Sequence, residues 1–315
     1  MRTVILALTD ELRRLRAAGV KTVSMSDESL GTLRRLARTR EAGEGTLDPG
    51  EGERPAVTGE VQEAGLRPPV SRLREPAARP PPADTSGLPP PPVVALPAGD
   101  KAVRWQALRE LVLNHPVCRA HVGPGKQVVF GVGSLEAKIM FVGEAPGADE
   151  EDQGEPFVGP AGQLLTKMIL AMGLARKEVY IGNIMNWRPE LARRPDSRQI
   201  GNREPTAGEM AFCLPFLTAQ IEVVDPAVVV ALGATAARGL LGHHSFRNLG
   251  DVRGRWHEWR GRPLRVTYHP SYLLRKEADG RDAANRAKRI AWEDFLAVME
   301  RGGLTISPKQ RNYFL

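Results

Sequence analysis

The chain has 315 residues, a formal net charge of +7 and two cysteines, Cys118 and Cys213. Two cysteines do not provide the disulfide framework of a small secreted protein, and no apolar run approaches the roughly 20 residues of a membrane-spanning helix. We therefore expect a cytoplasmic protein that does not associate with a membrane.

The first 100 residues differ in composition from the rest of the chain. Half of the 26 prolines lie between Pro49 and Pro97, and such a stretch cannot bury enough apolar surface to offset the entropy of ordering it. We expect a short helical N-terminal element over residues 1–41 and a disordered Pro-rich linker over residues 42–100. The helical element would either dock onto a protein partner or cover the main domain.

The charges divide at the same point. Residues 1–100 carry 14 basic and 14 acidic side chains, so the whole basic excess, 30 against 23, lies in residues 101–315. A basic folded domain behind a neutral leader suggests a polyanionic partner, although excess arginine is also common on plain solvated surfaces.

Residues 101–315 predict one α/β domain. Apolar, β-branched runs typical of buried strands occur at 138–143, 179–184, 227–233 and 264–269, with a possible edge strand in "QVVFGVG". Helical stretches lie between and after them, at about 161–173, 206–224, 234–241 and 287–300. Continuous apolar strands that alternate with helices indicate a four-stranded parallel sheet covered on both faces, and hence a three-layer α/β/α domain.

Three polar clusters follow the predicted strands. The first strand ends in "GEAPG", the second carries Asn183 near its end, and the fourth ends in "YHPSYLLR". In open α/β sheets, ligands bind outside the carboxyl ends of the strands. We therefore expect these clusters to meet at one edge of the sheet and form a binding site.

Four segments in this order resemble family 4 uracil-DNA glycosylases: "GEAPGADEEDQGEPFVGPAGQLL", "VYIGNIMNWRP", "NREPTAGEMAFCLPFL" and "TYHPSYLLR". Each segment alone is a weak signal, but together they are specific, and they cover about residues 115–300. The resemblance implies a monomeric DNA-repair enzyme that flips uracil out of DNA and hydrolyses its N-glycosidic bond.

The resemblance assigns the base-binding residues. Phe157 would form the flat wall of the pocket, since a ring stacked on a flipped base contributes roughly 1 to 3 kcal/mol; the alternative is a Phe in the core of the sheet. Asn183 offers a donor and an acceptor to the O4 and N3–H edge of uracil, a pattern that disfavours cytosine. It could instead only cap a loop. The backbone at Gly143 and Ala145 would form the turn against the base.

Four residues have implied catalytic roles. His269 would donate a hydrogen bond to uracil O2 as negative charge develops there. Glu150 is expected to orient the attacking water and Glu144 to shape the pocket, while Asn202 would lie near the water-activating carboxylate. Ala145 stands where a related glycosylase family with the motif Gly-Gln-Asp-Pro-Tyr carries its water-activating Asp, so catalysis cannot depend on a carboxylate at that position.

Further residues are expected to contact DNA. Leu273 would fill the hole left by the flipped base, and Arg275 would contact a phosphate, although two leucines after a turn can also begin a core-facing helix. A basic insertion, "ELARRPDSRQIG", would bring Arg193 and Arg194 to the DNA backbone, or else remain a solvated loop. The insertion has no His, so we do not expect covalent capture of the sugar.

The cysteine pattern departs from the family. Most members hold a [4Fe-4S] cluster on four cysteines, of which this chain keeps Cys118 and Cys213, with Trp187 at a third position and His115 and His121 flanking Cys118. Two thiolates and a His leave the cluster short of a ligand. We therefore expect no metal site and no cofactor requirement, with Trp187 filling the vacated volume; the family resemblance leaves a [4Fe-4S] cluster as the alternative. Two alternative functions stay open: a non-catalytic DNA-binding module and a glycosylase for another deaminated base.

Overall fold

The computed structural model describes residues 87–191, 199 and 201–314. The predicted N-terminal helices and most of the predicted linker lie outside these residues. Within them the helices are α3 (Lys101–Leu113), α4 (Pro116–Ala120), α5 (Ala148–Gln153), α6 (Pro160–Ala171), α7 (Ala207–Val224), α8 (Gly233–Leu241), α9 (Pro270–Glu277), α10 (Arg281–Arg301) and α11 (Pro308–Arg311). The strands are β1 (Val132–Gly133), β2 (Ile139–Gly143), β3 (Tyr180–Asn183), β4 (Val228–Leu232), β5 (Trp256–Trp259) and β6 (Arg262–Thr267).

The six strands form one mixed sheet in the order β1-β3-β2-β4-β6-β5. Strands β3, β2, β4 and β6 run parallel, and β1 and β5 pair antiparallel at the two edges. The prediction of an α/β domain is therefore confirmed. The sequence analysis did not identify β5, since "WHEW" carries two charged or polar residues and joins β6 through a tight turn in which Arg260 and Gly261 have positive φ.

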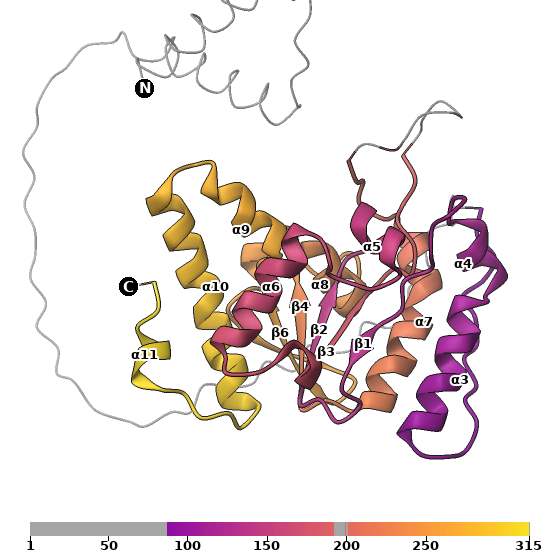
Figure 1. Cartoon of the computed structure of the whole chain (residues 1–315), viewed down its shortest axis with the longest axis horizontal. Coiled ribbons are helices and arrows are strands. Elements are labelled where there is room, and N and C mark those ends of the chain that lie inside the picture. The colour runs from indigo at the N-terminus through magenta and orange to yellow at the C-terminus, as the bar shows by residue number, and fades with distance from the viewer. Residues whose placement is uncertain (1–86, 192–198, 200, 315) are drawn as a thin grey trace, which may run out of the picture. The chain divides into compact units, whose positions relative to one another are not determined.

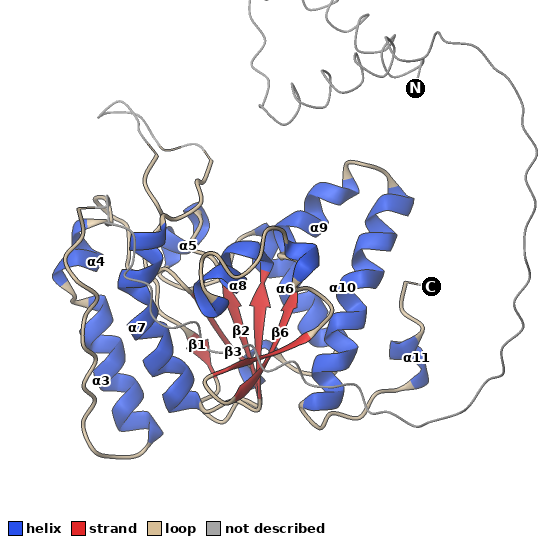
Figure 2. Cartoon of the chain, turned by 180° about the vertical axis from the view of Figure 1, so that it is seen from behind, coloured by secondary structure: helices blue, strands red, loops and turns tan. Residues whose placement is uncertain are grey.

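Side chains of the central strands point alternately into two hydrophobic clusters. Met140 and Val142 of β2 belong to the cluster that also holds α3, α7 and α8, whereas Ile139 and Phe141 belong to the cluster with α6 and α10. This alternation follows from the two-residue period of a strand. Helices therefore cover both faces of the sheet, as Figures 1 and 2 show for α3 and α7 on one side and α10 on the other.

The last part of the predicted linker is packed against the domain. Residues 87–100 contain no helix or strand, but Leu88, Val94 and Leu96 are partly buried against the cluster formed with α3 and α7. The sequence predicts a disordered linker as far as residue 100. The structure instead packs these three apolar side chains against the domain before α3 begins at Lys101.

The strand register brings the carboxyl ends of the parallel strands together. Gly143 at the end of β2 pairs with Asn183 at the end of β3, and Leu232 at the end of β4 pairs with Thr267 at the end of β6. The chain turns directly from these ends into α5, α8 and α9. Residues that lie far apart in the sequence therefore meet at one edge of the sheet.

Helix α7 is the one helix in the described part of the chain that is long and apolar enough to cross a membrane by length and composition. The sheet and α3 cover much of it, and 67% of that window is buried inside the domain. Its apolar side chains thus belong to the core of the domain.

Candidate active site

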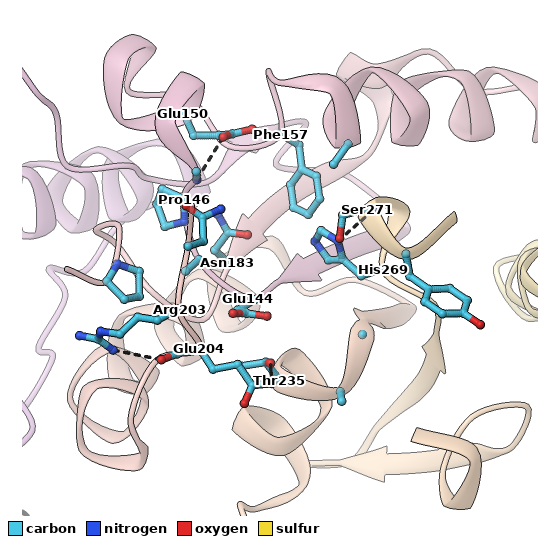
Figure 3. A pocket seen from close by; sticks show the side chains of 18 of the residues that line it. Glu144, Pro146, Glu150, Phe157, Asn183, Arg203, Glu204, Thr235, His269 and Ser271 are labelled. Atoms are coloured by element: carbon cyan, nitrogen blue, oxygen red, sulfur yellow. Dashed lines mark hydrogen bonds between the residues drawn. The ribbon is translucent and has the colours of Figure 1, made fainter. Parts of the chain in front are cut away.

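A pocket of about 630 Å³ lies at the carboxyl ends of the parallel strands. Loops after β2, β3 and β6, the segment before α7 and the first turn of α8 all contribute to its walls (Figure 3). Eight of the residues predicted from the sequence line it: Glu144, Ala145, Glu150, Phe157, Asn183, Asn202, His269 and Arg275. The predicted convergence of the polar clusters is thus found in the structure.

Asn183 presents an unused polar atom to this pocket. The residue is 7% exposed, and its buried Oδ1 has no hydrogen-bond partner among the described residues. An unpaired buried acceptor costs about 1 to 3 kcal/mol, so buried amides normally have partners. The amide is therefore available to a ligand that brings its own donor.

Gly143 allows Asn183 and Phe157 to approach the end of β2 closely. A Cβ at this position would lie 2.4 Å from Oδ1 of Asn183 and 2.5 Å from the ring of Phe157. Real Cβ contacts are essentially never this short. Because Gly143 has no side chain, the Asn183 amide and the Phe157 ring can both pack against its Cα.

Phe157 lines the pocket and is also buried in the sheet's core cluster. Its φ of +56° is rare for a residue with a side chain. Strain of this kind persists only where the surroundings fix the backbone. Arg176 does so from one side by donating to the carbonyl of Pro156 at 2.6 Å. The ring centroid of Phe157 lies 5.6 Å from that of His269.

Glu150 fixes the backbone on both sides of the pocket loop. Its Oε2 accepts a hydrogen bond from the backbone N–H of Gly147 at 3.1 Å, and its Oε1 accepts from Val158 and Gly159, both at 3.0 Å. Three backbone donors therefore share one carboxylate. This ties the loop that leaves β2 to the segment that holds Phe157.

Glu144 is a half-buried carboxylate with no backbone donor of this kind. Burial raises its pKa above the ordinary value, a hydrogen bond from Thr235 lowers it, the charge of Glu204 raises it and that of Arg238 lowers it. The net direction is upward. Its carboxylate faces the open pocket (Figure 3).

The hydrogen bonds of His269 define its tautomer. Nδ1 accepts from the backbone N–H of Ser271 at 3.1 Å and lies 2.8 Å from the hydroxyl of that residue. Because Nδ1 is an acceptor, the proton of the neutral ring is on Nε2. Burial and the charge of Arg275 lower the pKa of His269 to about 4. The ring is therefore neutral at pH 7 and carries its N–H donor on Nε2.

Asn202 is held by a buried arginine. Nε of Arg188 donates to Oδ1 of Asn202 at 2.8 Å, and the two terminal nitrogens of Arg188 donate to Gly201 O at 2.7 Å and to Glu151 at 2.9 Å. Arg188 is 6% exposed. With Oδ1 engaged, Asn202 keeps its NH₂ group for the pocket.

The residues expected to contact DNA have different placements. Arg275 is exposed at the pocket edge on α9. Leu273 is 1% exposed and packs with Ala287 and Ala291 of α10. This burial fits the alternative of a core-facing helix rather than a residue that enters the DNA, because α9 turns Leu273 toward α10. Arg193 and Arg194 lie outside the described residues.

Comparison with known proteins agrees with this geometry. Residues 130–296 match the family model of the Uracil DNA glycosylase superfamily. The chain belongs to this superfamily. It is 40% identical over 190 residues to the Type-4 uracil-DNA glycosylase of Thermotoga maritima. The aligned residues make up 60% of this chain and 90% of that relative. The corresponding protein of Pyrobaculum aerophilum is 39% identical over 179 residues, with 55% of this chain and 86% of the relative covered. The corresponding protein of Archaeoglobus fulgidus is 42% identical over 151 residues, with 46% of this chain and 70% of the relative covered.

The residues at the cluster position of the glycosylase family do not fit a four-ligand cluster. Cys118 and Cys213 are fully buried, and burial raises the pKa of Cys118 to about 12 and that of Cys213 well above its usual value. Trp187, fully buried, stacks on His121 with centroids 4.8 Å apart. Among the described residues no three His, Cys, Asp or Glu side chains are grouped to hold a metal ion. Two cysteines beside Trp187 are too few ligands for a cluster that four cysteines hold.

Three polar residues near the glycosylase pocket escaped the sequence analysis: Arg188, Glu204 and Thr235. Arg188 lies inside the quoted segment "VYIGNIMNWRP", but its partner Asn202 is 14 residues away. Glu204 and Thr235 meet across 31 residues, from the segment before α7 to the first turn of α8. Only the position of Glu204 inside "NREP" gave a local signal.

Proposed function

We propose that the protein removes uracil from DNA by hydrolysing the bond between the base and the deoxyribose. The observation that carries the proposal is the unpaired, buried Oδ1 of Asn183 in a pocket that the Phe157 ring and a neutral His269 also line. Membership of the uracil-DNA glycosylase superfamily and the names of its Type-4 relatives support the same activity.

Asn183 and Phe157 would select the flipped base. Oδ1 of Asn183 would accept the N3–H of uracil while the NH₂ group donates to O4. Cytosine presents an acceptor at N3 and a donor at its exocyclic amine, so the same amide would face mismatched groups. The Phe157 ring, held at a positive φ by its loop, would stack on the base.

The departing base would be stabilised as an anion. When the glycosidic bond breaks, its electron pair stays on the uracil ring, and negative charge reaches O2. The Nε2–H of His269 is a suitable donor to that oxygen, since a neutral imidazole strengthens its hydrogen bond as charge develops. The first turns of α6, α8 and α9 also line the pocket, through Ala161, Ala234 and Ser271, and direct the positive ends of their dipoles to it.

The sugar would receive a water molecule activated by Glu144. Water adds to the anomeric carbon of the sugar, and its proton passes to the carboxylate. The contacts of the two glutamates support a division opposite to the one expected from the sequence. Glu150 is occupied by three backbone N–H groups, whereas Glu144 faces the open pocket. The NH₂ group of Asn202, oriented by Arg188, would help to place the water.

We further propose that the catalytic domain is a three-layer α/β/α domain around the four parallel strands. We also propose that the protein works as a cytoplasmic monomer and holds no iron-sulfur cluster. The two free, buried cysteines are consistent with a reducing compartment. Arg275 at the pocket edge would contact a DNA phosphate.

The test is cleavage of a labelled oligonucleotide that contains one uracil, followed by alkali to break the abasic site. Wild type should give strand breakage, and Asn183→Ala and His269→Ala should suppress it while keeping the fold. Oligonucleotides with hypoxanthine or xanthine in place of uracil test the other deaminated bases. No breakage despite retained binding to uracil-containing DNA would contradict the proposal and indicate a DNA-binding module.

A further inference from the structure

The hydroxyl of Thr235 lies in the same pocket as two carboxylates, Glu144 and Glu204. It donates to Oε1 of Glu204 at 3.2 Å and also lowers the pKa of Glu144 by hydrogen bonding. Figure 3 shows the three side chains on the same side of the pocket. A threonine hydroxyl has a single proton, so it can donate to only one carboxylate at a time. The two glutamates therefore compete for this donor, and its hydrogen bond favours the ionised form of Glu144.

The backbone that carries Glu204 is fixed in place. Arg203 donates from Nη1 to the carbonyl oxygen of Glu204 at 3.0 Å, and its two terminal nitrogens bind the carboxylate of Glu209 at 2.7 and 2.6 Å. Glu209 is buried and also accepts from the N–H of Thr206 at 2.7 Å, as part of the capping box of α7. Glu204 is thus attached to the first turn of α7, which holds its position opposite α8.

Charged groups reach Glu144 from three directions. Glu204 comes from the segment before α7, and Arg238 comes from α8 with its Nη1 3.8 Å from the carboxylate of Glu204. His269 and Arg275 line the same pocket from β6 and α9. His269 is neutral at pH 7 and adds no charge. The negative charge that raises the pKa of Glu144 is that of Glu204, which lies outside the loop that carries Glu144.

We infer that Thr235 and Glu204 together control the protonation state of Glu144, which makes Glu204 a positioning residue of the excision reaction; this inference rests on the function proposed above. Removing the Glu204 charge favours ionised Glu144, because like charges disfavour one another. A neutral amide oxygen also competes less strongly than a carboxylate for the Thr235 proton. Removing the Thr235 hydroxyl has the opposite effect, because ionised Glu144 loses a donor. The two substitutions therefore act on Glu144 in opposite directions.

The experiment compares wild type with Glu204→Gln and Thr235→Val in single-turnover uracil excision from pH 4 to 8. If Glu144 is the base proposed above, activity should fall at low pH as Glu144 becomes protonated. Glu204→Gln should move this acid limb to lower pH, and Thr235→Val should move it to higher pH. The shift for Glu204→Gln should be a few tenths of a pH unit, because 69% of the Glu204 side chain is exposed and solvent screens its charge.

Glu222→Gln is the matched control. Glu222 is also an exposed glutamate paired with an arginine, Arg260 at 3.4 Å, but it lies on α7 away from this pocket. Its acid limb should coincide with that of wild type. General damage to the fold lowers the rate without moving the limb in opposite directions, so it cannot imitate the expected pair of shifts.

A titration of the Glu144 carboxyl carbon by NMR, assigned with Glu144→Gln, separates this inference from the proposed function. The pKa should fall in Glu204→Gln and rise in Thr235→Val whether or not the protein is active. Unchanged pKa values in an active enzyme, or shifts of the same sign, would overturn the inference alone. A wild type that never releases uracil would overturn the proposed function, and with it the role of Glu204 in the reaction.

Discussion

The Nε of Arg188 donates a hydrogen bond of 2.8 Å to Oδ1 of Asn202. Each of the three guanidinium nitrogens makes a hydrogen bond, since the two terminal nitrogens bind Glu151 and the carbonyl of Gly201. Arginine presents its donors in a rigid, planar fork, whereas lysine offers a flexible point charge. A lysine at this position would therefore keep the charge but lose the contact that orients Asn202.

We expect Arg188→Lys to lower the single-turnover rate of uracil excision by about 10- to 100-fold, the order of loss that a misplaced group causes. A double-mutant cycle with Asn202→Ala checks the route of this effect. In the Asn202→Ala background, Arg188→Lys should cost little further activity. Independent, multiplying losses would show instead that Arg188 acts through the general stability of the loop.

The three backbone bonds to Glu150 predict a loss of stability on Glu150→Gln. A glutamine has one acceptor oxygen and turns an NH₂ group toward backbone donors, so at least one N–H loses its partner, at a cost of about 1 to 3 kcal/mol. Urea denaturation should show this decrease in the free energy of unfolding, and excision should fall with it as the Phe157 loop moves.

Glu155→Gln is the control for Glu150→Gln, since Glu155 is a partly exposed glutamate in the same loop whose ion pair with Arg176 spans 3.5 Å. It should leave stability almost unchanged, as expected for a surface pair. A Glu150→Gln variant with wild-type stability and a much lower rate would restore Glu150 as the residue that activates water.

The close contacts at Gly143 predict a specific loss of function on Gly143→Ala. The new Cβ would displace the Asn183 amide or the Phe157 ring, and a displacement of about 1 Å at a reacting centre can cost 100-fold. We expect uracil excision to fall by about this factor with only a moderate decrease in melting temperature. Gly123→Ala, whose Cβ would be 3.9 Å from its nearest neighbour, serves as the control.

The aromatic surroundings of the two cysteines predict that activity does not depend on iron. Protein purified without oxygen should contain far less than four iron atoms per chain, as measured by metal analysis and by absorbance near 400 nm. The Cys118→Ala/Cys213→Ala double variant should excise uracil at the wild-type rate. It should lose stability by about 0.5 to 3 kcal/mol per site through lost core packing. Stoichiometric iron that the double variant loses would contradict this prediction.

Apolar runs and short motifs allowed much of the frame and pocket to be predicted. Strands β2 and β4 are buried on both faces, which gives them the uninterrupted apolar sequence of a parallel sheet. Motifs at strand ends were sufficient for Asn183 and His269, because the carboxyl ends of parallel strands meet at one edge.

Contacts between distant segments could not be predicted in this way. The pairing of Thr235 with Glu204 leaves no local pattern in the sequence, because it depends on how two distant segments pack. For Leu273 the sequence left two roles open, and the choice depends on how α9 packs against α10. The division of roles between Glu144 and Glu150 depends on backbone N–H directions, and no motif specifies these. β5 was missed for a related reason, since an edge strand with polar residues does not show the pattern of a buried one.

The neutral, buried ring of His269 predicts a pH-dependent loss of stability. Its pKa is about 4 in the folded protein and 6.5 without the fold, so between these values the unfolded chain binds more protons. Stability from this residue is therefore complete above pH 6.5 and decreases as the pH falls toward 4. Between pH 8 and pH 5 the decrease amounts to about 2 kcal/mol, at 1.36 kcal/mol per pH unit.

Urea denaturation at pH 8 and pH 5 checks this for wild type, His269→Gln and, as the matched control, His243→Gln. His243 is an exposed histidine away from the pocket. The loss between the two pH values should be smaller in His269→Gln than in wild type by about 2 kcal/mol, because glutamine does not titrate. His243→Gln should lose as much as wild type. Equal losses in all three proteins would mean that His269 is readily protonated in the folded state, and the neutral donor proposed for uracil O2 would have to be replaced by an imidazolium.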